Sequence, residues 1–148
     1  MTLTIRHALE ADAPHAIDVL RRSISELCAA DHGDDAKATE AWLRNKTVAA
    51  WAQWIARDDA TVLVAGMRGE ILGVGMLDAR GDVLLNYVRP DARFTGVSTA
   101  LLAAMEDAAR ARGATRLFLE STQTARRFYQ HRGYVAVGEA CLQMEKRL

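Results

Sequence analysis

Apolar residues recur along this chain at two spacings, and the changes between them mark helices and strands. Polar and apolar side chains alternate over residues 2–8, as in a half-buried strand, and three short, mainly apolar runs separated by turn residues lie between residues 61 and 88, as in the strands of a meander. Elsewhere apolar residues recur every three or four positions, as in helices packed on a core. The pattern predicts helices over residues 12–30, 37–44, 47–57, 96–113 and 122–132, and strands over 2–8, 61–67, 70–77, 82–88, 115–120, 134–139 and 140–147.

This order of elements indicates the fold class. A strand, three helices, a three-stranded meander, and then two helix–strand units predict an α/β (α+β) domain. Arg68-Gly69 is a hairpin signal, and a second hairpin is expected near Gly138. We therefore expect residues 1–148 to form a single domain, with helices flanking one twisted, mixed and mainly antiparallel sheet of about seven strands.

Charge is distributed unevenly, although the net charge is zero. Residues 1–86 carry nine Lys/Arg and thirteen Asp/Glu, a balance of −4, whereas residues 87–134 carry eight Arg and four Asp/Glu, a balance of +4. Such a local positive region suits a small anionic ligand better than nucleic acid, which needs a wider basic face. We expect no nucleic-acid partner.

The length of the apolar runs and the spacing of the cysteines bear on where in the cell the protein is expected. No run approaches the roughly 18 apolar residues that span a bilayer, and the N-terminus shows no secretory h-region. Cys28 and Cys141 form neither a disulfide framework nor a metal-ligand spacing. A cytoplasmic protein without a membrane partner is expected.

A loop before the helix at residue 96 is suited to bind an anion. The strand over 82–88 ends at Arg89-Pro90-Asp91, and a short loop then enters the helix through Gly96. The first turn of a helix presents unpaired N–H groups and the positive end of the helix dipole. Glycine allows the backbone to approach a ligand closely. The stretch predicts a phosphate-binding loop, and an ordinary strand-to-helix turn is the alternative.

Two motifs in this region resemble one known family. Residues 93–98, Arg-Phe-Thr-Gly-Val-Ser, resemble the (Gln/Arg)-x-x-Gly-x-(Gly/Ala) pyrophosphate loop of the GCN5-related N-acetyltransferases, the GNAT superfamily. Residues 125–134 resemble that superfamily's A-x-x-F-Y-x-x-x-G-(F/Y) segment. The resemblance is sharp over residues 83–139. Phe94 stands where glycine is usual, and Ser98 where Gly or Ala is usual.

The resemblance implies acetyl-CoA as the acyl donor. None of the four histidines has metal-ligand spacing with another His, Asp or Cys, so no metal is expected. In the family, the strand before the loop splays from its parallel neighbour near the bulged end of the strand, here Asn86 to Pro90, and the gap takes the pantetheine arm. We then expect the Val88 amide to stabilise the oxyanion and Tyr129 to protonate the leaving thiolate. Coenzyme A would be bound by Tyr87, Val88, Arg93, Phe94, Thr95, Gly96, Val97, Ser98, Thr99, Thr122, Arg126 and Tyr129.

Tyr129, Thr122 and Glu120 each have a functional interpretation and a purely structural one. Tyr129 follows Phe128 on a helix, where a Phe-Tyr pair often packs in the core with one polar tip. Thr122 either bonds the pantetheine or caps the following helix. Glu120 either accepts a proton from the acceptor amine, directly or through water, or is an exposed structural carboxylate.

The sequence says less about the acceptor than about the acyl donor. Glu26, His32 and Trp51 are the expected substrate-binding residues, within an acidic and tryptophan-containing part of the chain that suits a cationic amine. A small-molecule amine and a peptide amine both fit, and homodimerisation is possible in such a family. The favoured function is direct transfer of an acetyl group to a primary amine in a ternary complex. The alternative is an acyl-CoA-binding sensor of the same fold without efficient turnover.

Overall fold

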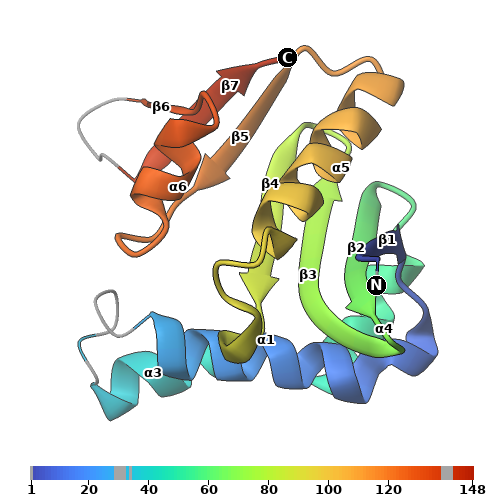
Figure 1. The fold of residues 1–148 in the computed structure, drawn as a ribbon, viewed down its shortest axis with the longest axis vertical. Coiled ribbons are helices and arrows are strands. Elements are labelled where there is room, and N and C mark those ends of the chain that lie inside the picture. The colour runs from blue at the N-terminus through green and yellow to red at the C-terminus, as the bar shows by residue number, and fades with distance from the viewer. Residues whose placement is uncertain (1, 29–32, 34, 138–141) are drawn as a thin grey trace.

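The computed structural model describes residues 2–28, 33, 35–137 and 142–148. Within them, one sheet has the strand order β1-β2-β3-β4-β5-β7-β6, and only β4 and β5 pair in parallel (Figure 1). The predicted mixed, mainly antiparallel sheet flanked by helices is confirmed. The strands are β1 Thr4–His7, β2 Ala60–Met67, β3 Glu70–Asp78, β4 Asp82–Val88, β5 Arg116–Glu120, β6 Val135–Ala136 and β7 Gln143–Arg147.

Helices cover both faces of the sheet. On one face, α5 (Val97–Ala111) packs on β2, β3 and β4, and its buried residues join one core cluster with Tyr129 and Tyr134. On the other, α1 (Ala13–Leu27) packs on β3 and β4, and α4 (Val48–Ala56) packs on α1 and β2. The remaining helices are α3 Ala36–Leu43 and α6 Arg126–His131, with 3-10 turns η1 Glu10–Asp12 and η2 Pro90–Ala92.

A buried carboxylate joins α5 to the carboxyl-terminal strands. Glu106 of α5 accepts hydrogen bonds from the Tyr134 hydroxyl at 2.9 Å and from Lys146 Nζ at 3.0 Å. Burial and the negative charge of Glu106 raise the pKa of Tyr134, so its phenol stays protonated. Because a buried charge is tolerated when it is paired and hydrogen-bonded, this contact is structural.

The turn between β3 and β4 sets the start of β4 beside β5. The Asp78 carboxylate accepts from the amides of Arg80 and Asp82 at 2.9 and 3.0 Å. The Gly81 carbonyl then accepts from the Phe118 amide at 2.8 Å, which begins the parallel pairing. Gly81 has φ +94°, and a Cβ there would lie 2.6 Å from the Arg116 carbonyl oxygen.

We expect Gly81→Ala to destabilise the protein by roughly 2–4 kcal/mol, because it combines a left-handed backbone with a backbone clash. Gly113→Ala is the matched control, since Gly113 has φ +84° but its Cβ would meet nothing within 4 Å. Urea unfolding of both variants measures the difference. Equal losses in the two variants would show that the contact with Arg116 does not constrain the turn.

Some predicted element ends differ from the structure. The helix expected from residue 122 begins at Arg126, and the strand expected over 134–139 is seen only as Val135–Ala136. The helix expected from residue 12 begins at Ala13, and the carboxylate of the preceding Asp12 accepts from the Leu9 amide at 2.7 Å and pairs with Arg6, so it does not cap α1. The expected turn at Gly138 and Cys141 lie outside the described residues. None of the helices in the described part of the chain has the length and apolar character needed to cross a bilayer.

Candidate active site

The parallel pair at the centre of the sheet separates after two residue pairs. Asp82 and Val83 of β4 pair with Phe118 and Leu119 of β5, after which the strands diverge (Figure 1). The β3–β4 register shifts at the same point, because Leu77 pairs with Val83 while Met76 pairs with Leu85. Leu84 is thus an extra residue on β4 without a partner on β3, and such a bulge bends the strand and increases its twist. The expected bulge is therefore at Leu84, and the prediction that it lies at the carboxyl end of β4 is wrong.

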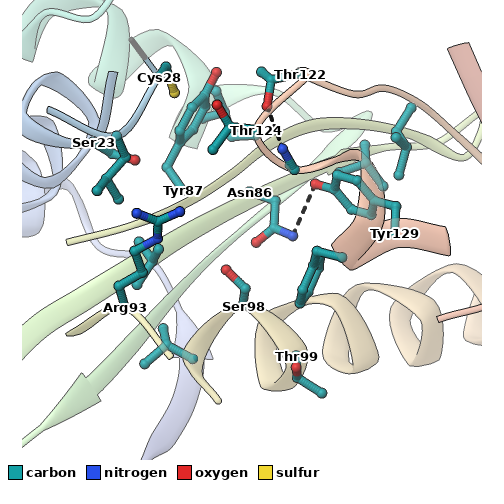
Figure 2. Close-up of a pocket in the computed structure, with 18 of the residues that line it drawn as sticks. Ser23, Cys28, Asn86, Tyr87, Arg93, Ser98, Thr99, Thr122, Thr124 and Tyr129 are labelled. Carbon is teal, nitrogen blue, oxygen red and sulfur yellow. Dashed lines mark hydrogen bonds between the residues drawn. The ribbon is translucent and has the colours of Figure 1, made fainter. Parts of the chain in front are cut away.

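A cavity of about 450 Å³ occupies the gap. Its walls are β4 from Val83 onward, the loop and first turn of α5, the end of β5, and α6 (Figure 2). Ser23 and Cys28 of the α1 region close one side. The cavity thus joins the two motifs that are some thirty residues apart in sequence.

Two backbone amides of β4 point into the gap. The Arg89 amide donates to the Leu72 carbonyl at 2.8 Å, so Leu72 and Arg89 form a hydrogen-bonded pair. Hydrogen-bonded and non-hydrogen-bonded pairs alternate along an antiparallel ladder. The pairs of Val88 with Gly73 and of Asn86 with Gly75 are consequently of the second kind. The N–H groups of Asn86 and Val88 therefore face away from β3, towards the side where β5 has departed.

The loop before α5 has the backbone of an anion site. Phe94 and Gly96 both have positive φ, +64° and +86°, and Gly96 is the N-cap of α5 without a side-chain cap. The amides of the first turn after Gly96 thus keep their donors for a ligand. Thr95 hydrogen-bonds back to the Ala92 carbonyl and braces the loop. Phe94 is 92% exposed and packs outside the core, with its ring centroid 4.7 Å from the Arg93 guanidinium.

Tyr129 faces the cavity from α6. Its ring is 6% exposed and lies edge-to-face with Phe128 and Tyr134, at centroid distances of 5.2 and 5.7 Å. The Tyr129 hydroxyl accepts a hydrogen bond from Asn86 Nδ2 at 3.2 Å (Figure 2). Burial raises the pKa of Tyr129 to about 12, although the Asn86 hydrogen bond partly offsets it. The phenol is therefore protonated at neutral pH and, since its oxygen is the acceptor, retains its own proton to donate.

A second cavity, of about 790 Å³, adjoins the first. The two share residues at the diverging ends of the strands, including Leu84, Tyr87, Glu120 and Thr122. The rest of its wall includes Trp42, Lys46 and residues of β7. A ligand in either cavity can thus reach the gap between β4 and β5.

Comparison with known proteins agrees with this geometry. The family model described as "Acetyltransferase (GNAT) domain" matches residues 28–145. The protein belongs to the GNAT family. Membership supports acyl transfer as the general activity of this chain.

Solved structures show the same fold over the whole GNAT domain. A GCN5-related N-acetyltransferase from Rhodopseudomonas palustris is 28% identical, with a TM-score of 0.89 over 100% of this chain and 97% of that one. The PaiA N-acetyltransferase of Thermoplasma acidophilum, in complex with coenzyme A, has a TM-score of 0.89 at 20% identity, covering 100% of both chains. A ribosomal-protein-alanine N-acetyltransferase from Brucella melitensis is 25% identical, with a TM-score of 0.68 over 98% and 99%. A search of curated proteins finds no match.

Most of the residues expected to bind coenzyme A meet at this GNAT cavity. Thr95 and Arg126 are not among its lining residues, and Arg126 Nε is buried without a hydrogen-bond partner in the described structure. Thr122 lines the cavity while its hydroxyl accepts from the Ala125 amide at 3.1 Å, so it caps the turn before α6. The expected residues that line the cavity are Tyr87, Val88, Arg93, Phe94, Gly96, Val97, Ser98, Thr99, Thr122 and Tyr129.

The expected acceptor residues are less well placed. Trp51 is 0% exposed, packs between α1 and the sheet, and donates from Nε1 to the Leu9 carbonyl at 3.0 Å. Glu26 is exposed, pairs with Arg22 at 3.3 Å and lines neither cavity. The structure therefore does not bring Trp51 or Glu26 to the site, and His32 lies outside the described residues. Trp42 is the tryptophan that lines the second cavity.

Asn86 and Arg132 line the cavity and were not among the predicted site residues. Asn86 holds the Tyr129 hydroxyl, and its Oδ1 is buried with no partner among the described residues. Arg132 lies over the Phe128 ring at 4.1 Å and donates from Nη2 to the Thr99 hydroxyl at 2.8 Å, so it adds a positive charge beside the first turn of α5. The i,i+4 spacing of Phe128 and Arg132 on one helix is the sequence feature from which their contact could have been predicted. In the part of the chain that the structure describes, no group of three or more His, Cys, Asp or Glu side chains is arranged to hold a metal.

Proposed function

We propose that this protein transfers an acetyl group from acetyl-CoA to a primary amine, by direct attack in a ternary complex. One observation carries the proposal: inward-facing amides of β4, the uncapped start of α5 and the protonated phenol of Tyr129 border a single cavity. These groups match, in order, the carbonyl oxygen, the pyrophosphate and the leaving sulfur of an acyl-CoA.

The residues fit an acyl-CoA as substrate. Free amides after Gly96 suit the pyrophosphate, with Arg93 and Arg132 as nearby cations. The unpaired side of β4 suits the amide groups of the pantetheine arm, which can add to the strand as a further strand does. On this proposal the thioester lies in the opening between β4 and β5, beside Val88 and Tyr129.

The transfer follows from this placement. The free amine attacks the thioester carbonyl carbon, and a C–N bond forms while the carbonyl oxygen becomes an oxyanion stabilised by the Val88 N–H. The new ammonium loses a proton to Glu120 or to water. Collapse of the intermediate breaks the C–S bond, and the Tyr129 hydroxyl protonates the departing thiolate. Holding both reactants in one site supplies much of the acceleration.

Cofactor binding is testable without knowing the acceptor. Acetyl-CoA and coenzyme A, at about 100 times their dissociation constants, should stabilise the fold by roughly 2.7 kcal/mol, which raises the unfolding midpoint by about 5–10 °C for a chain of this size. ATP should not reproduce the shift. Ser98→Asp should abolish it, because a carboxylate in the first turn of α5 repels the pyrophosphate while favouring the helix itself.

Thermal unfolding of the wild type and of Ser98→Asp, with and without each ligand, checks this expectation. The ligand-free Ser98→Asp variant is expected to unfold at or above the wild-type midpoint, which separates lost binding from lost stability. A wild type that responds to neither CoA species at millimolar concentration would refute cofactor binding at this loop, and the proposed acetyl transfer with it.

A further inference from the structure

The second cavity contains two opposite charges that have no ionic partner in the described chain. Glu120, at the end of β5, lines both cavities, and Lys46, in the connection between α3 and α4, lines only the second. The cavity's other carboxylates are engaged, since Asp82 is 3.7 Å from Arg80 and Glu145 is 3.5 Å from Arg116. No described ion pair includes Glu120 or Lys46.

Lys46 is unusual because it is only 7% exposed. Its backbone is fixed, with the amide donating to the Leu43 carbonyl at 2.9 Å and the carbonyl accepting from Arg21 Nη1 at 3.2 Å. Its ammonium hydrogen-bonds the neutral Asn45 side chain at 2.5 Å. An ammonium has three donors, so two remain for a ligand. Removal from water lowers the pKa of Lys46, which is the cost of burying a cation without a carboxylate beside it.

The positions of Glu120 and Lys46 indicate how a charged acceptor would be oriented in the second cavity. Glu120 borders the gap where the amine must meet the thioester, whereas Lys46 lies in the part of the second cavity that the first does not share. A positively charged amine is therefore favoured beside Glu120 at the gap, and a negative group is favoured beside Lys46. Trp42 supplies an aromatic wall in the same cavity.

We propose that the acceptor is an amino carboxylate, an amino acid or very short peptide whose amine lies towards Glu120 and whose carboxylate is bound by Lys46. The inference rests on the proposed acetyl transfer. A volume of about 790 Å³ is within the range of small-molecule sites. Lys46 is on this account a specificity residue that touches the substrate but not the reacting atoms.

The test uses pairs of acceptors that differ only in charge: leucine, γ-aminobutyrate and alanylalanine, each beside its own carboxamide. Coenzyme A release from acetyl-CoA is followed in the wild type, Lys46→Met, Lys46→Arg and Lys37→Met. Lys37 is an exposed lysine on α3, so its variant makes the same charge change away from the cavity. Methionine fills the space of lysine without its charge, and we expect Lys46→Met to unfold at or above the wild-type midpoint.

The expected result is a carboxylate preference of about 10- to 100-fold in kcat/KM for at least one pair, the usual range for a hydrogen bond to a charged group. Lys46→Met should remove that preference mainly by raising KM for the carboxylates, and should change the carboxamide rates much less. Lys46→Arg should retain part of it, and Lys37→Met all of it. A preference that survives Lys46→Met, or a wild type that favours the carboxamides, would overturn the inference.

Binding of the same probes to the protein with coenzyme A, measured by thermal shift, separates the two proposals. Amino carboxylates that bind through Lys46 but are never acetylated would contradict the proposed transfer, and would leave Lys46 as a carboxylate-binding residue but not as part of an acceptor site. Amines that are acetylated without regard to charge would support the transfer and contradict the inference. If no probe is acetylated and no probe gives a Lys46-dependent thermal shift, that result also contradicts the inference.

Discussion

Tyr129→Phe is expected to lower kcat for acetyl transfer by about 100-fold, with little change in the affinity for acetyl-CoA. The substitution removes one hydroxyl and keeps the ring that packs against Phe128 and Tyr134. Without a phenol proton, the thiolate must leave unprotonated or wait for a water. The loss should therefore appear in the chemical step and not in ground-state binding.

Tyr134→Phe is the matched control for this experiment. It removes the same atom from the neighbouring ring, but the Tyr134 hydroxyl binds Glu106 in the core and does not border the cavity. We expect it to lower stability and to leave kcat nearly unchanged. Steady-state rates, acetyl-CoA dissociation constants and unfolding midpoints of both variants measure the contrast.

The pH profile gives a second readout of the Tyr129 role. A general acid must be protonated, and the pKa of Tyr129 is raised to about 12. Activity should rise with pH as the acceptor amine loses its proton, with no descending limb assignable to Tyr129 in the neutral range. Equal turnover by the wild type and Tyr129→Phe would exclude the acid role. Tight acetyl-CoA binding without acetylation of any amine would favour the sensor alternative.

The order of elements could be predicted from sequence because it depends on local periodicity. The strand over 82–88 was predicted with its observed bounds, and Thr47 caps α4 as a threonine before an apolar run should. Residues 122–125 were less predictable, because Thr122 satisfies the Ala125 amide in a turn that has the local composition of a helix start. The fold class follows from the order, since few layer arrangements can bury these faces.

The site was predictable where the chain itself fixes the geometry. The loop before α5 and the Phe128-Tyr129 pair are short motifs whose backbone or helical spacing places them. The acceptor side depends on which face of a short helix meets the core. In α4 nearly every position is apolar, so the sequence does not distinguish the buried Trp51 from a residue of a cavity wall. Only packing against α1 decides it.

The bulge and Asn86 required information from distant strands. An extra residue at Leu84 is defined only by the register of β4 on β3, and register depends on both strands. Asn86 and Tyr129 are 43 residues apart and meet because β4 and α6 border the same gap. Neither position has a short-range signal. The hydrogen-bonded environment of Tyr129 is for that reason a property of the fold.

Val88→Pro is expected to lower kcat by about 100- to 1000-fold, the usual loss when one oxyanion donor is removed. The register puts the Val88 N–H outside the β3–β4 ladder, so proline removes the proposed donor without removing a ladder hydrogen bond. The residue before a proline is restricted to extended conformations, which Tyr87 already has as a strand residue. Arg89 continues to donate to the Leu72 carbonyl and holds the strand end.

Val88→Ala is the control, because it loses the same packing against the core while keeping its N–H. Its kcat should stay within a few-fold of the wild type, and both variants should retain acetyl-CoA binding and a single unfolding transition. If Val88→Pro binds acetyl-CoA and turns over as fast as Val88→Ala, the Val88 amide is not the oxyanion donor. The Asn86 amide, which faces the same gap, would then be the backbone group to test. A loss confined to kcat in the proline variant would place the oxyanion at Val88, since a strand distorted by the ring would also weaken cofactor binding.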